Sequence, residues 1–106
     1  MNPVIFIYVT VPSEAEAQKI AQAVVADRLA ACANIIPGMK SLYHWEGKIE
    51  QGNEVIIIFK TRAELFQAVE ARVKELHSYS APCIVSLPLT NVSSGFMQWI
   101  LAETKP

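Results

Sequence analysis

The sequence predicts an α+β fold in which four strands are combined with two helices and a third helix ends the chain. Three observations support this prediction. Val4 to Val11 and Val55 to Phe59 are uncharged runs rich in β-branched residues, as buried strands are. Two other segments repeat apolar residues at the period of a helix. At 106 residues and 52% hydrophobic, the chain is expected to fold as a single domain, residues 1–106.

The first helix is expected directly after the strand at Val4 to Val11. Pro12 ends that strand, and Ser13 with Glu16 forms the S-x-x-E capping box that opens a helix. The apolar face of this helix then repeats at i, i+3, i+4 and i+7, with Ala17, Ile20, Ala21 and Val24. The helix is therefore expected to lie on the sheet through a narrow face and to end near Asp27 to Leu29.

A long hairpin is expected next, and two dipeptides compete to reverse it. Gly52-Asn53 is the better hairpin dipeptide by composition. Reversal at Glu46-Gly47, however, pairs two apolar runs, with Ile36 opposite Ile57 and Trp45 opposite Lys48. Because register follows the hydrophobic pattern wherever one face is buried, we predict reversal at Glu46-Gly47. Bulges or kinks are then expected opposite each other at Pro37-Gly38 and Gly52-Asn53.

The second half of the chain is expected to repeat the strand and helix pattern. Thr61 and Glu64 form a T-x-x-E capping box, and the helix that follows is expected to end near His77. Its apolar face comprises Leu65, Val69, Val73 and Leu76. After a loop, Cys83 to Leu87 alternates as a fourth strand, which Pro88 suits to a sheet edge. A last helix, capped between Asn91 and Ser94, carries Phe96, Trp99 and Ile100.

The order β-α-β-β-α-β, with right-handed crossovers, is that of the ferredoxin-like plait. In this plait the first and third strands are central and the helices cover one face of the sheet. Both central strands are apolar on their two faces, so the second face exposes an apolar patch of roughly several hundred Å², a size that soluble monomers avoid. We predict an obligate homo-oligomer whose long hairpin reaches onto a neighbouring copy.

Charge and motif content exclude several classes of function. Nine basic and ten acidic residues are scattered singly, which predicts no nucleic-acid partner. The run Val4 to Val11 is too short to span a membrane and has no basic region before it, so the protein is predicted to be cytoplasmic, without a membrane partner. The chain has no Gly-rich phosphate loop, His-Glu-x-x-His or nucleophile elbow, and is predicted not to be an enzyme. Cys32 and Cys83 are expected to be free and largely buried.

Taken together, these segments make the whole chain resemble the CutA family of divalent-cation tolerance proteins. The specific signals are Leu29 to Gly38, the Tyr43-x-Trp45-x-Gly47-Lys48-Ile49 hairpin tip, Glu54 and the pair Lys60-Thr61. The resemblance implies a ferredoxin-like fold assembled into a tight trimer around the open sheet face. It also implies a role in tolerance of copper and other divalent cations, without a required cofactor.

The resemblance further directs attention to metal ligands. Family members have proposed ligands at a cysteine near the end of the first strand and at histidines that end the second helix. In this chain Val9 lies near the first position and His77 is the one histidine at the second. The segment that reads His-Pro-Tyr-Glu-x-Pro-Glu in the family runs from His77 to Cys83 here and lacks both carboxylates.

The candidate metal ligands are His77 and Cys83, which lie on either side of the Ser78 to Pro82 turn. An imidazole and a thiolate suit copper, zinc or another divalent cation, with a third ligand supplied by a neighbouring copy. The alternative for His77 is structural: a histidine at the end of a helix can bond the last carbonyls.

A second candidate site is a cleft between subunits, formed by Tyr43, Trp45, Glu54, Lys60 and Tyr79. The two aromatic residues share one face of the hairpin, where they either pack on a neighbour or stack on a ligand. The polar residues form either a salt bridge or contacts to a small anionic ligand. This second interpretation corresponds to an alternative function, that of a trimeric signalling or adaptor protein similar to the PII proteins.

Overall fold

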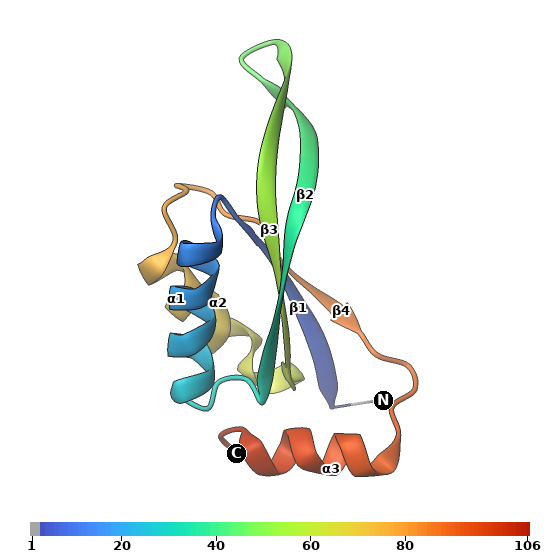
Figure 1. The fold of residues 1–106 in the computed structure, drawn as a ribbon. Helices are drawn as coiled ribbons and strands as arrows, with labels where there is room; N and C mark the ends of the chain where they lie inside the picture. Colours follow the sequence, from blue (N-terminus) through green and yellow to red (C-terminus); the bar gives the residue numbers. More distant parts are fainter. Residues whose placement is uncertain (1–2) are drawn as a thin grey trace.

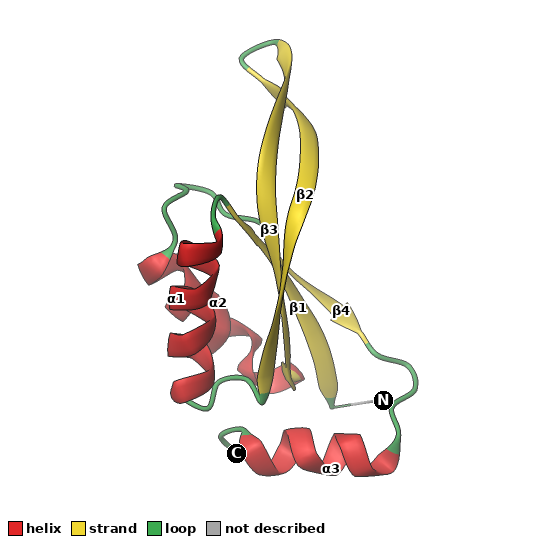
Figure 2. Ribbon diagram, viewed as in Figure 1, coloured by secondary structure: helices red, strands yellow, loops and turns green. Residues whose placement is uncertain are grey.

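The structure, a computed structural model, describes residues 3–106 and contains one mixed arrangement of strands and helices (Figures 1 and 2). Its elements, in order, are β1 (Val4–Val11), α1 (Glu14–Ala26), β2 (Cys32–Trp45), β3 (Lys48–Arg62), a short 3-10 turn (Ala63–Leu65), α2 (Phe66–Leu76), β4 (Ile84–Pro88) and α3 (Ser94–Glu103). This is the predicted β-α-β-β-α-β order with a C-terminal helix, so the predicted α+β, ferredoxin-like fold is confirmed.

The four strands form a single antiparallel sheet in the order β2-β3-β1-β4. Strands β1 and β3 are therefore central and β2 and β4 are the edges, as predicted. Helices α1 and α2 lie side by side against one face of this sheet, and α3 runs across its lower end (Figure 1). The face opposite α1 and α2 is called the open face below.

The core lies between the sheet and helices α1 and α2. Side chains alternate along β3, with Val55, Ile57, Phe59 and Thr61 buried and the residues between them half-buried. The buried set meets the inner residues of α1 and α2, which include Ile20, Val24, Val69 and Val73. The half-buried set, with its neighbours on β1, lies on the open face and comprises Phe6, Tyr8, Ile56 and Ile58. Both faces of the central strands are thus apolar, as their sequences indicated.

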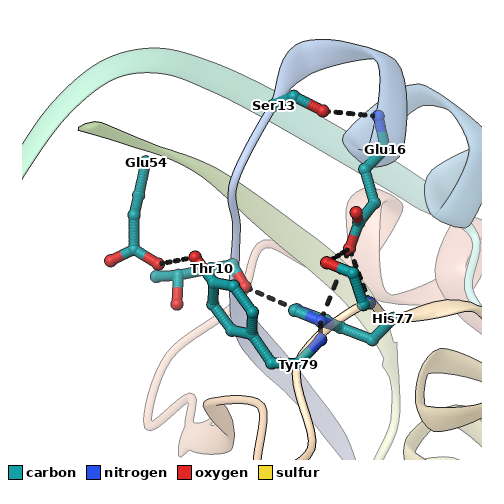
Figure 3. Close-up of polar contacts among 7 residues, drawn as sticks. Thr10, Ser13, Glu16, Glu54, His77 and Tyr79 are labelled. Atoms are coloured by element: carbon teal, nitrogen blue, oxygen red, sulfur yellow. Dashed lines mark hydrogen bonds and ion pairs between the residues drawn. The ribbon is translucent and has the colours of Figure 1, made fainter. Parts of the chain in front are cut away.

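The first helix begins where the capping box predicted. Ser13 Oγ accepts a hydrogen bond from the Glu16 N–H at 3.2 Å, which satisfies one of the free amides of the first turn. The Glu16 side chain reaches away from this cap, because its carboxylate accepts bonds from the N–H and the hydroxyl of Ser78, each at 3.0 Å. It thereby ties the start of α1 to the loop after α2 (Figure 3).

The second predicted capping box, Thr61 with Glu64, is wrong. Strand β3 continues to Arg62, and the fully buried Thr61 hydroxyl donates to the Leu29 carbonyl at 2.6 Å instead of capping a helix. Helix α2 begins only at Phe66, after the 3-10 turn, and its N-cap makes no side-chain hydrogen bond. The sequence pattern assigned the Thr61 hydroxyl to the N-cap of α2. In the structure this hydroxyl bonds instead to the buried carbonyl of Leu29, in the loop between α1 and β2.

The hairpin reverses at Glu46-Gly47, as predicted, with φ values of 50° and 78°. Two positive φ values in succession are typical of the type I′ turn, whose twist matches that of the flanking strands. Trp45 lies opposite Lys48, but Ile36 lies opposite Ile56 rather than the predicted Ile57.

The cause of this shift is a bulge in β2 at Pro37-Gly38, where one was predicted. Pro37 and Gly38 both lie between the paired residues Ile36 and Met39, where β3 contributes Val55 alone. Gly38 has a φ of 83°, which a glycine adopts without strain. The predicted bulge at Gly52-Asn53 is wrong, because both residues are in regular register with Ser41 and Lys40.

The outer halves of β2 and β3 project beyond the sheet as a two-stranded arm (Figure 1). The molecule is correspondingly elongated, with extents of 45 × 26 × 22 Å. At the other end, Arg62 donates to the Thr104 hydroxyl at 2.8 Å and to the Leu101 carbonyl, which fixes the end of α3 to β3. Within residues 3–106, no helix has both the length and the apolar character needed to cross a membrane.

Candidate functional site

A groove of about 910 Å³ lies where the base of the arm meets the loop after α2. Its walls come from β1, β2 and β3 on the open face, and from residues 79–83 of the loop. The volume is within the range of roughly 300–1,000 Å³ that is typical of small-molecule sites. This groove is the candidate functional site.

The bulge at Pro37-Gly38 determines which arm residues reach the groove. Before the bulge, the open face of β2 carries even-numbered residues such as Ile36, which lies opposite Ile56. After it, the odd-numbered residues are on that face, because the bulge adds one residue to β2 relative to β3. Tyr43 and Trp45 therefore line the groove, whereas a regular strand would point them to the opposite face.

Glu54 holds the groove together by joining the arm to the loop. One carboxylate oxygen accepts a hydrogen bond from Ser41 Oγ at 2.7 Å, and the other accepts one from the Tyr79 hydroxyl at 3.1 Å. Figure 3 shows the Tyr79 ring reaching across to Glu54. Burial and the adjacent Glu54 carboxylate raise the pKa of Tyr79 to about 12, so the phenol stays protonated and keeps donating.

His77 lies behind Tyr79 and positions the loop. Its side chain is fully buried, and Nδ1 accepts the Tyr79 backbone N–H at 3.0 Å. Nε2 must therefore carry the proton, which it donates to the Thr10 carbonyl at 2.7 Å. Both ring nitrogens are used in this arrangement (Figure 3), and Glu16 approaches Nδ1 at 3.4 Å.

The predicted metal pair is only partly suited to a metal. His77 has no free lone pair in this conformation, and Cys83 is exposed rather than buried as expected. Burial and, to a lesser extent, the Glu54 charge raise the pKa of the Cys83 thiol, which disfavours the thiolate that binds metals. Across residues 3–106, no group of three or more His, Cys, Asp or Glu side chains is placed to hold a metal ion.

Four of the five residues predicted for the cleft line the groove: Tyr43, Trp45, Glu54 and Tyr79. Lys60 does not join them. It lies toward the far end of β3 opposite Cys32, with its ammonium 5.5 Å from the centre of the Phe6 ring and 5.4 Å from that of Phe96. These are cation–π distances, and they place the lysine beside α3.

Several groove residues were not identified from the sequence. Tyr8 contributes from β1, and its hydroxyl donates to Met39 Sδ at 3.5 Å. Glu50 lies opposite Tyr43 on the arm, and Ser41 holds Glu54. Reversal at Glu46-Gly47 places Glu50 opposite Tyr43, so the sequence could have identified Glu50 as a groove residue. The contact between Tyr8 and Met39 depends on the bulge and could not be identified in this way.

Comparison with known proteins identifies the relatives of this chain. Residues 5–103 match the family model described as CutA1 divalent ion tolerance protein. The divalent-cation tolerance protein CutA of Archaeoglobus fulgidus is 47% identical over 95 residues, which are 90% of this chain and 92% of that protein. The chloroplastic protein CutA of Arabidopsis thaliana is 39% identical over 103 residues.

The matched residues make up 97% of this chain but only 57% of that Arabidopsis protein. The chain therefore spans little more than half the length of this relative. Among solved structures, the crystal structure of CutA1 from Oryza sativa superposes with a TM-score of 0.95 at 37% identity, covering 97% of this chain and 94% of that one. The similarity of the backbone therefore extends over the arm and the loop after α2.

Proposed function

The chain belongs to the CutA1 divalent ion tolerance family, and on this basis we propose that it acts in the tolerance of divalent cations, copper among them. The observation that carries the proposal is the match over residues 5–103, together with relatives that are named divalent-cation tolerance proteins. We propose a non-enzymatic role, in keeping with a family named for tolerance rather than for a reaction.

The test of tolerance is growth. Cells of the source organism that lack the gene are expected to grow more slowly than the parent strain as copper in the medium rises, and the restored gene is expected to reverse this. Equal growth of all three strains across copper, zinc and cobalt would contradict the proposal.

The proposed assembly is a homotrimer built on the open face. That face carries apolar side chains exposed in the single chain, among them Val85 at 48%, Leu87 at 45% and Ile36 at 44%. A second and third copy would remove this surface from water, a gain of roughly 25 cal/mol per Å² buried. Light scattering at micromolar concentration is expected to give three times the 11.7 kDa mass of the chain, and the mass of one chain would contradict it.

Metal binding is proposed to be weak and to use His77 and Cys83, with a third ligand from a neighbouring copy. For His77 to bind copper, the imidazole must release either the Thr10 carbonyl or the Tyr79 N–H, and the lost hydrogen bond weakens the site. Calorimetric titration of Cu(I), Cu(II) and Zn(II) is expected to show weaker binding in Cys83→Ser and in His77→Ala. Cys32→Ser is the control, and binding that is the same in all variants would reject these ligands.

The alternative, a PII-like protein that binds a small anion, is not favoured by any observation. Among the described residues that line the groove, the charged ones are Glu50 and Glu54, and two carboxylates do not suit an anionic ligand. The cytoplasmic location stays a prediction, and the Arabidopsis relative carries the word chloroplastic in its name.

A further inference from the structure

The open face of β3 carries opposite charges at the two ends of an apolar stretch. Its side chains there are, in order, those of Glu54, Ile56, Ile58 and Lys60, and all are half-buried in the single chain. Six residues of extended strand span roughly 20 Å, at about 3.3 Å per residue. The carboxylate and the ammonium of one chain therefore do not meet.

Lys60 has no carboxylate partner in its own chain. Its ammonium lies over the rings of Phe6 and Phe96, at 5.5 and 5.4 Å from their centres. The ion pairs formed within residues 3–106 do not include this lysine. Aromatic rings hold an ammonium in place, but they carry no net charge that could neutralise it.

Glu54 is a carboxylate without a cation beside it. It accepts hydrogen bonds from the hydroxyls of Ser41 and Tyr79, which fix its position and leave its charge in place. No lysine or arginine is among the described residues that line the groove. The strands contain one other carboxylate, that of Glu50, which lies farther out on the arm. Glu54 is thus the carboxylate that borders the apolar stretch.

Covering the open face requires a partner for both of these charges. In the proposed assembly, neighbouring copies remove Ile56 and Ile58 from water, and the half-buried charges at the ends of the same stretch lose water with them. A charge buried without a partner is strongly destabilising, and a partner of opposite charge offsets part of that cost. A second copy that packs its Lys60 end against the Glu54 end of the first supplies this partner.

We propose that a neighbouring copy completes the groove, with its Lys60 ammonium forming an ion pair with Glu54 beside the rings of Tyr43 and Tyr79. The aromatic walls suit this occupant, since an ammonium is attracted to the faces of aromatic rings. In a trimer each copy gives its lysine to one neighbour and receives one from the other, which is a heterologous contact that closes a ring. The pairing rests on the proposed assembly, because one chain cannot make it.

The test is coupling of the assembled wild-type protein with a water-soluble carbodiimide, which joins a carboxylate to an amine where the two are in contact. Trypsin then cuts after arginine and after each lysine that is not coupled. Coupling between copies is expected to join a peptide 49–60, through Glu54, to a second peptide 49–62, through Lys60. Coupling within one chain gives a single closed peptide 49–62 instead, and mass spectrometry separates the two products. Fragmentation distinguishes Glu54 from Glu50.

Lys74 and Glu70 provide the internal control, because they form an ion pair at 3.3 Å within α2. Coupling is continued until the link between them is detected. Lys60→Arg keeps the positive charge but has no amine that carbodiimide couples, so it is expected to abolish the joined peptides and to retain the assembled mass. Lys19→Arg, on the exposed side of α1, is the matched control and is expected to leave the joined peptides unchanged.

Light scattering before coupling separates failure of the pairing from failure of the assembly. If the protein has the assembled mass and the joined peptides are absent, Lys60 does not complete the groove, although the assembly stands. The same conclusion follows if the closed peptide 49–62 forms in place of the joined peptides, or if the joined peptides persist in Lys60→Arg. The mass of one chain would overturn both the pairing and the assembly.

Discussion

At the residue scale, Tyr79 is the point at which the arm, the loop and the end of α2 meet. Its hydroxyl donates to Glu54, its backbone N–H donates to His77, and its ring lies 4.8 Å from the imidazole, measured between ring centres. These contacts come from β3, the loop and the end of α2, so the orientation of Tyr79 reports whether the groove is assembled.

The raised pKa of Tyr79 predicts how the groove responds to alkaline pH. An unfolded tyrosine loses its proton near pH 10, whereas burial and the Glu54 charge hold the pKa of Tyr79 at about 12. Between these values the unfolded state gains from releasing the proton, so the stability present below about pH 10 is lost as the pH rises toward about 12. Titration by tyrosinate absorbance is expected to show a late step that Tyr79→Phe removes.

Tyr8→Phe is the control for this titration and is expected to retain the late step, because Tyr8 is not among the groups that raise the pKa of Tyr79. Tyr79→Phe is also expected to flatten the fall in stability over the same pH interval, measured by denaturant unfolding at fixed chain concentration. A late step that persists unchanged in Tyr79→Phe would show that Glu54 does not hold this phenol.

Sequence reasoning found four of the groove residues as a set but not the contacts that position them. Tyr43, Trp45, Glu54 and Tyr79 were identified, whereas the bond between Glu16 and Ser78 joins residues separated by 62 positions. The S-x-x-E pattern assigned the Glu16 carboxylate to its own helix, and tertiary packing gave it a distant partner instead. Local patterns cannot rank such partners, because the competing hydrogen bonds have similar free energies, each about 1 kcal/mol.

At the element scale, the β2–β3 arm depends on the bulge at Pro37-Gly38. The choice of the Glu46-Gly47 turn followed correctly from the pairing of two apolar runs. The predicted register at the base of the arm was wrong, because a bulge of one extra residue shifts every residue pair beyond it. The same bulge turns Tyr43 and Trp45 onto the open face, so it is a determinant of the groove as well as of the sheet.

Gly38→Ala is therefore expected to destabilise the protein by about 1–2 kcal/mol, because a φ of 83° is strained for any residue with a Cβ atom. No atom lies within 4 Å of the added Cβ, so the effect comes from the backbone rather than from a clash. Gly95→Ala is the matched control, since it also meets no atom within 4 Å but lies in α3, where alanine is expected to stabilise by about 0.5 kcal/mol.

Denaturant unfolding at one chain concentration measures both variants. Loss of stability in Gly95→Ala as large as in Gly38→Ala would indicate that any added methyl group is harmful. No loss in Gly38→Ala would mean that the bulge tolerates a different backbone conformation.

At the scale of the whole molecule, the open face is the feature that one chain leaves unfinished. Helices α1 and α2 cover one side of the sheet (Figure 1), while the other presents apolar side chains from β1, β2, β3 and β4, among them Ile36, Ile58 and Leu87. The two-faced apolar character of β1 and β3 was visible in the sequence, because neither strand alternates apolar with polar residues. The groove was not visible there as one cavity, since its walls combine three strands and a loop.

Leu87→Lys tests whether this face is the contact between copies. Leu87 lies opposite Phe6 on the open face and is 45% exposed in the single chain, so a lysine side chain can reach water in the monomer and the fold is expected to survive. Burial between copies would strip that ammonium of water, at a free-energy cost of several kcal/mol per ion. Light scattering at micromolar concentration is expected to show a shift from the assembled mass toward that of one chain.

Ser86→Lys is the matched control because it adds the same charge on the same strand. Ser86 lies opposite Ile7, on the other face of the sheet, and is exposed. It is therefore expected to retain the assembled mass. If both variants keep the wild-type mass and melting temperature, the open face of β4 does not contribute to the assembly, and the apolar surface of β1 and β3 must be covered in another way. If both variants dissociate, the charge itself rather than its position on the open face weakens the contact.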